Sequence, residues 1–168
     1  TVYLYAANGS HTGKLTTPFS ASARADVDAY CAPKTSLSVI AVPSFSHYHA
    51  FISISADDAI INFPSRYALP ANWKIKSFSG NIIAHNWADL FDGSINMKLE
   101  SAGVVDTFWW SGSNIDGSYE NENNCGGWTV GTNDKMGRTG AHNALDSDWI
   151  FESTRNCNNS LKLLCIGW

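Results

Sequence analysis

The chain has 168 residues, only 15% of which are charged, and a formal net charge of −4 at pH 7. This length suits one domain with its own core, so we expect a single domain over residues 1–168. No apolar run approaches the roughly 20 residues of a membrane-spanning helix, and the negative charge argues against non-specific binding to nucleic acid or an anionic membrane.

Secondary-structure signals in the first part of the chain predict a strand and then a helix. Residues 1–5 are mainly β-branched or aromatic and run into the turn-forming Asn8-Gly9-Ser10, which predicts the strand. Ser20 or Ser22 can cap a helix in which apolar residues recur at three- and four-residue steps up to Cys31. That spacing puts Cys31 on the buried face of the helix.

The middle of the chain predicts short elements only. Residues 36–42 and 49–54 are rich in β-forming side chains, and residues 55–58 predict a helix start with acids in its first turn. Prolines at 64 and 70 prevent a long continuous helix. Residues 86–93 predict a compact helical turn that ends in glycine. From Asp106 onward we expect short strands joined by polar loops.

The cysteines favour disulfides over a metal site. Cys31, Cys125, Cys157 and Cys165 form no C-x-x-C pair and no Cys/His cluster with zinc spacing. Disulfides indicate an oxidising compartment, hence secretion or display at a cell surface. Free buried thiols in a cytosolic protein are the alternative. The spacing by itself leaves the connectivity open.

An ordered series of motifs covers nearly the whole chain. The helix containing Cys31 is followed by Phe51-Ile52-Ser53, by the sequence Trp-Ala-Asp-Leu-Phe-Asp-Gly-Ser at 87–94, by Trp-Ser-Gly-Ser at 110–113, and by Gly117, Cys125, Trp128, Gly140, Cys157 and Cys165. This order resembles the endostatin domain, and in particular the endostatin-like domains of bacterial surface proteins. Endostatin belongs to the C-type-lectin-like superfamily.

The resemblance implies an α+β fold of the C-type-lectin-like, endostatin-like kind. Short helices would lie around a twisted, mainly antiparallel sheet with long ordered loops. It also implies nested disulfides, Cys31–Cys165 and Cys125–Cys157. In function it implies adhesion to matrix or cell-surface components, as expected of an adhesin tip.

Catalytic motifs are missing from the sequence, so we expect no enzyme and no catalytic residues. The five histidines are scattered, and no nucleophile elbow, zinc-protease helix or phosphate-binding glycine loop is present. His47 and His49 lie on one face of an expected strand and could hold a metal, although a pair that merely forms hydrogen bonds is favoured. A metal-dependent hydrolase using the histidines is kept as an alternative.

Calcium binding is a second alternative. Asp116, Glu120, Glu122 and Asn123 supply the carboxylate and amide oxygens that calcium prefers. However, the chain lacks the Glu-Pro-Asn or Gln-Pro-Asp and Trp-Asn-Asp sequences of calcium-dependent C-type lectins. It also lacks, at matching positions, the histidines by which endostatin holds zinc and the arginines by which it binds heparan sulfate. We therefore expect no required cofactor.

Aromatic and polar residues of two loops are the expected ligand contacts. Trp109 and Trp110 point to opposite faces of a strand, so we expect Trp110 in the core and Trp109 free to stack on a ligand. The predicted binding surface is formed by the loops 113–124 and 131–149. Its residues are Trp109, Asn114, Asp116, Tyr119, Glu120, Glu122, Asn123, Asp146, Asp148 and Trp149.

The sequence therefore predicts a non-catalytic extracellular recognition module, adhesin-like, that binds a cell-surface or matrix glycan or protein. A calcium-assisted lectin, the hydrolase and a structural cap of a fibre remain alternatives. We expect no nucleic-acid partner and no membrane insertion. The domain is expected to be displayed on a larger or oligomeric protein.

Overall fold

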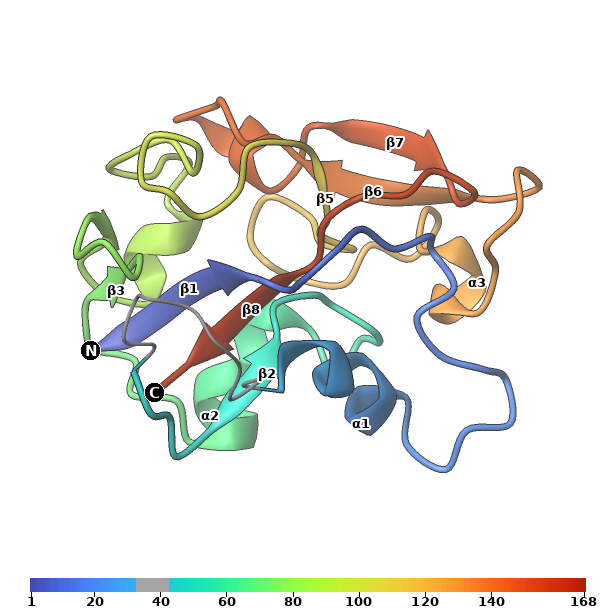
Figure 1. Ribbon diagram of the computed structural model, residues 1–168, viewed down its shortest axis with the longest axis horizontal. Helices are drawn as coiled ribbons and strands as arrows, with labels where there is room; N and C mark the ends of the chain where they lie inside the picture. The colour runs from blue at the N-terminus through green and yellow to red at the C-terminus, as the bar shows by residue number, and fades with distance from the viewer. Residues whose placement is uncertain (33–42) are drawn as a thin grey trace.

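The computed structural model of the chain describes residues 1–32 and 43–168. It combines short helices with two small sheets (Figure 1), and the predicted α+β class is therefore confirmed. The strand predicted at residues 36–42 lies outside the described residues.

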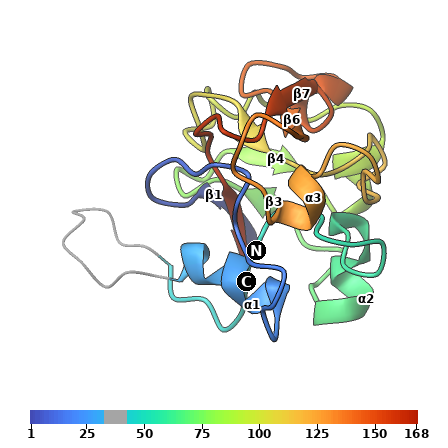
Figure 2. The same cartoon turned by 90° about the vertical axis from the view of Figure 1, so that its right-hand side faces the viewer.

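The larger sheet joins the two ends of the chain. Its five strands lie in the order β2 (Tyr48–Ala50), β8 (Leu164–Gly167), β1 (Val2–Ala6), β3 (Ile75–Lys76) and β4 (Ile82–Ala84). The first predicted strand is thus confirmed as β1. Because β1 runs antiparallel to β8 with Tyr3 opposite Gly167, the two termini lie close together, as Figures 1 and 2 both show.

The smaller sheet is antiparallel and lies above the larger one in Figure 1. Its strands are β5 (Trp109–Trp110), β6 (Met136–Gly140) and β7 (Ser153–Asn156). These strands confirm the short elements expected after Asp106. The predicted loop 131–149 therefore contains β6, so it forms two connections rather than one loop.

The helices are short, and among the described residues none is long and apolar enough to cross a membrane. They are α1 (Ala23–Asp28), η1 (Ala29–Cys31), η2 (Ile60–Asn62), α2 (Phe63–Tyr67), η3 (Ala88–Phe91), α3 (Cys125–Trp128) and η4 (Ser147–Trp149). Ser22 caps α1 by accepting the Ala25 N–H at 3.1 Å, as predicted. The helix start predicted at 55–58 is wrong: Ile54 donates its N–H to the backbone carbonyl of Asp58 and closes a turn, and the first helical residue is Ile60.

Both faces of the larger sheet are covered by apolar side chains. Along β8, Leu164 and Ile166 pack with Val2 and Leu4 in one core cluster, whereas Cys165 packs in a second cluster. Successive side chains of a strand point to opposite faces, so a strand covered on both sides has no exposed position. All four residues of β8 are buried for this reason.

Both predicted disulfides are present and nested. Cys31 at the end of η1 bonds Cys165 in β8, and Cys125 bonds Cys157. All four cysteines are buried, as predicted for Cys31. Gly13 lies so close to the Cys125–Cys157 bond that a Cβ atom would not fit. Since such bonds persist in oxidising compartments, the structure supports an oxidising, extracellular environment.

Candidate functional site

The loop 113–124 is held in shape by its own side chains. The Glu120 carboxylate accepts the backbone N–H groups of Glu122 at 3.0 Å and Asn123 at 2.8 Å. Asn124 donates to two loop carbonyls and accepts an N–H of α3. Glu120 is only 7% exposed. The prediction of Glu120 as a ligand contact is therefore corrected: its oxygens bind the loop itself.

Asp116 remains exposed at the tip of this loop. Its Oδ1 accepts the Ser118 N–H at 2.9 Å. The side chain of Ser118, and then its backbone N–H, lower the pKa of Asp116 below the ordinary value. A lowered pKa keeps this carboxylate charged in more acidic solution than a free aspartate. Asp116 is thus a stable negative charge on the surface.

The other predicted contacts in this loop differ in exposure. Glu122 is exposed, whereas Asn114, Tyr119 and Asn123 are half-buried. The Asn114 amide donates to the Ser118 hydroxyl at 3.0 Å and to the Tyr119 carbonyl at 3.1 Å, so it mainly holds the loop. Burial raises the pKa of the Tyr119 phenol, and the nearby Glu120 charge adds to this effect.

The two tryptophans predicted to contact ligand are buried. Trp109 and Trp149 are 0% and 1% exposed, and their ring centroids lie 5.9 Å apart. Trp110 enters the second core cluster, where its Nε1–H donates to the His11 carbonyl at 2.8 Å. The two β5 tryptophans do point to opposite faces, but both faces of this strand are covered. The prediction that Trp109 or Trp149 stacks on a ligand is therefore wrong.

Four segments meet at one surface, which we call the acidic face. Ile61 donates its N–H to the Gly117 carbonyl at 3.0 Å, and the ring of Phe91 packs on Gly117. Residues 91–95 also contact the connection after β6, because Ile95 donates to the Leu145 carbonyl at 2.8 Å. Exposed residues of the acidic face are Ile61, Asp92, Ile115, Asp116, Leu145, Asp146 and Asp148.

The acidic face combines negative charge with aliphatic surface. The segments 91–95, 114–118 and 145–148 contain four aspartates and no lysine, arginine or histidine. Ile61, Ile115 and Leu145 are 37%, 44% and 45% exposed, respectively. Asp116, Asp146 and Asp148 were predicted from the sequence, whereas the aliphatic residues were missed. For Ile115 and Leu145 the signal, a large apolar residue inside a polar loop, was present in the sequence.

The calcium site stays a prediction. Within residues 1–32 and 43–168, no group of three or more histidine, cysteine or acidic side chains is arranged to hold a metal ion. Of the four suggested ligands, Glu120 is engaged by backbone N–H groups, whereas Asp116 and Glu122 are exposed. Asp146 accepts the Asp148 N–H at 3.1 Å and so caps η4.

His47 and His49 both lie beside Trp168. Their ring centroids are 5.5 Å and 5.7 Å from that of Trp168. His49 Nδ1 lies 2.6 Å from Oδ2 of Asp28, which also accepts the Ala50 N–H on its other oxygen. The hydrogen-bonded role that the sequence favoured for His49 agrees with this contact.

No protein-family model matches the chain, and no curated protein matches it with significance.

Proposed function

We propose that this chain is a non-catalytic recognition module, secreted or displayed at a cell surface, which binds a cell-surface or matrix component through the acidic face. The observation that carries this proposal is the convergence of two loops on residues 91–95, with Asp116 and Asp146 both exposed. Two disulfides suit an extracellular setting.

The composition of this face favours a protein partner with a basic surface. Exposed aliphatic side chains beside carboxylates provide apolar contact and charge complementarity, which together give affinity and specificity in protein interfaces. Stacking on a sugar ring would use an exposed aromatic side chain, and the exposed residues of the acidic face include none. A glycan ligand is therefore the less favoured occupant.

We further propose that the fold is endostatin-like, within the C-type-lectin-like superfamily. The support is the pairing of Cys31 with Cys165 and of Cys125 with Cys157, which the resemblance implied. The sequence motifs around Trp87 and Trp110 also support an endostatin-like fold.

An array of matrix proteins and glycans, probed with the purified domain with and without EDTA, tests the function. We expect binding to a basic protein that survives EDTA and weakens as salt rises, since salt screens exposed charges. Binding lost in EDTA would instead support the calcium-assisted lectin. Binding to glycans alone would contradict a protein partner.

Charge-neutralising variants test the acidic face itself. The double variant Asp116→Asn/Asp146→Asn should bind the captured protein about tenfold more weakly, because two interfacial charges are removed. Asp134→Asn is the matched control. Asp134 is exposed and precedes β6, whereas Asp146 comes after β6. The five residues of this strand span about 17 Å, so the control charge lies at the other end of β6. Equal effects of the two changes would remove the acidic face from the proposal.

A further inference from the structure

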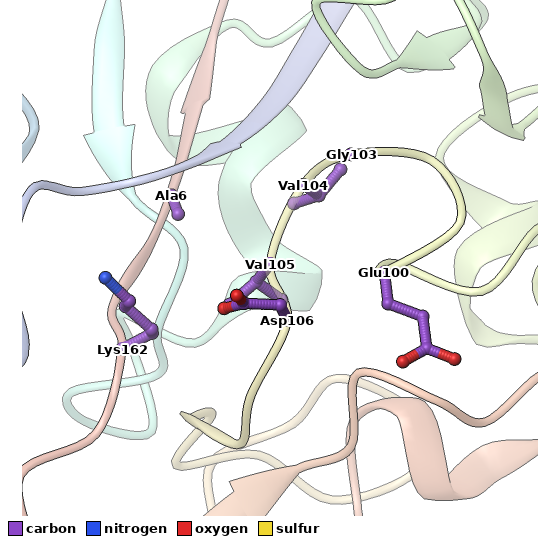
Figure 3. A pocket seen from close by; sticks show the side chains of 7 residues that line it. All are labelled: Ala6, Glu100, Gly103, Val104, Val105, Asp106 and Lys162. Atoms are coloured by element: carbon purple, nitrogen blue, oxygen red, sulfur yellow. The ribbon is translucent and has the colours of Figure 1, made fainter.

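A shallow pocket of about 300 Å³ shares no lining residue with the acidic face. It is lined by Ala6, Glu100, Gly103, Val104, Val105, Asp106 and Lys162 (Figure 3). The lining residues come from the end of β1, the segment before β8 and the loop 100–106. In Figure 3 the Asp106 carboxylate is turned toward the Lys162 side of the pocket.

The walls of this pocket are fixed by the fold. Lys162 donates its N–H to the Phe108 carbonyl at 3.3 Å and accepts the Trp110 N–H at 3.0 Å. On the opposite wall, Val104 and Val105 are buried and only 7% and 6% exposed. The pocket is therefore formed before any ligand arrives, which lowers the cost of binding.

Two residues that line this pocket, Asp106 and Lys162, carry opposite charges. Within residues 1–32 and 43–168, neither the Asp106 carboxylate nor the Lys162 ammonium group makes an ion pair or a side-chain hydrogen bond. Glu100 is different, because its Oε2 lies 2.9 Å from Nδ1 of His142. One free anion and one free cation thus line a small pocket together with Ala6, Val104 and Val105.

We propose that this pocket binds a free α-amino acid with an aliphatic side chain. The ammonium group of the ligand contacts Asp106 and its carboxylate contacts Lys162. The side chain lies on Ala6, Val104 and Val105. Charge-assisted hydrogen bonds are the stronger ones, and a zwitterion supplies the counter-charge for both free groups at once.

The same lining disfavours other small ligands. A residue inside a peptide carries neither charge, and a chain end carries only one of them. Phosphate and acidic side chains would approach both Asp106 and Glu100, which outnumber the single cation, Lys162. The volume is at the lower limit of ligand pockets, about 300 Å³, which suits one amino acid.

An NMR titration of the intact, ¹⁵N-labelled domain tests this proposal with leucine and two analogues that each lack one charge. Isocaproate lacks the ammonium group, and isoamylamine lacks the carboxylate. We expect leucine to shift the amide signals of residues 103–106 and of Lys162, and to bind at least about tenfold more tightly than either analogue. Methyl glucoside, a neutral polyol, should leave these signals unchanged.

Two charge-removing variants should act selectively. Asp106→Asn should reduce leucine affinity to the level of isocaproate, and Lys162→Met should reduce it to the level of isoamylamine. Asp134→Asn and Lys135→Met remove exposed charges before β6 and should leave leucine binding unchanged.

Four results would overturn the proposal: no leucine shift up to its solubility limit, shifts only outside the pocket, equal affinity for leucine and its analogues, or shifts caused by methyl glucoside alone. The pocket and the acidic face share no residue, so the failure of one proposal leaves the other standing.

Discussion

Gly112 is a position where the backbone and the packing both require glycine. Its φ of +58° is left-handed, and a Cβ atom would lie 2.6 Å from the Ser53 carbonyl oxygen and 2.7 Å from the Trp128 ring. Gly112→Ala therefore adds backbone strain to overpacking of a buried site. We expect a loss of about 2 to 4 kcal/mol in the free energy of unfolding. Urea denaturation, monitored by tryptophan fluorescence, measures this change in the free energy of unfolding.

Gly127 separates the two causes of that loss. Its φ of +70° is similar, but a Cβ atom there would meet nothing within 4 Å. Gly127→Ala should therefore cost only the strain of the left-handed backbone, about 1 kcal/mol. Equal losses for Gly112→Ala and Gly127→Ala would show that packing around Gly112 contributes nothing.

Single residues also show how far the sequence could predict exposure. Alternation along a strand correctly put Trp109 and Trp110 on opposite faces. It did not reveal that both faces are covered, because the partners of Trp109, Phe51 and Trp149, lie about 58 and 40 positions away along the chain. Burial depends on such distant segments, whereas alternation is local.

Among the elements, α1 is joined to β2 and to the segment after it by the side chain of Arg24. Its guanidinium donates to Asp58 through two nitrogens at 3.0 and 2.9 Å, and to the Ala50 and Ile52 carbonyls at 2.8 and 3.0 Å. Arg24→Met keeps an apolar stem but leaves Asp58 buried without its main counter-charge. We expect a loss of about 3 kcal/mol in the free energy of unfolding, measured in urea.

A double variant shows whether that loss of stability comes from the buried, unpaired carboxylate of Asp58. In Arg24→Met/Asp58→Asn the buried carboxylate is also removed, so the double variant should be more stable than the sum of the single effects indicates. Arg66 is the matched control, since it is exposed and lies 3.7 Å from the same carboxylate. Arg66→Met should leave stability nearly unchanged. Simple additivity in the double variant would contradict a coupled pair.

The ion pair between Arg24 and Asp58 also explains why the predicted helix start at 55–58 is wrong. Asp57 and Asp58 resemble the acids of a helix first turn, and the sequence therefore predicted a helix start at 55–58. In the structure Asp58 is buried and bonded to Arg24 and Tyr67, so it serves tertiary contacts instead of a helix end. Ser22, by contrast, caps α1 as predicted, because capping needs only residues of the same helix.

At the scale of the whole molecule, both candidate sites are assembled from distant segments. The acidic face joins residues near 61, 92, 115 and 145, and the pocket joins Ala6, Asp106 and Lys162. The sequence predicted the acidic loops because turn residues and charge clusters are local signals. It could not predict the pocket, because no local pattern relates positions 6, 106 and 162.

The two nested disulfides close loops of very different length. Cys31–Cys165 spans 134 residues and Cys125–Cys157 spans 32. Because a crosslink mainly restricts the unfolded chain, and more so for a longer loop, their removal should cost about 5 and about 4 kcal/mol. Urea unfolding of Cys31→Ala/Cys165→Ala and of Cys125→Ala/Cys157→Ala measures both. A larger loss for the shorter loop would mean that native packing around Cys125, including its contact with Gly13, outweighs chain entropy.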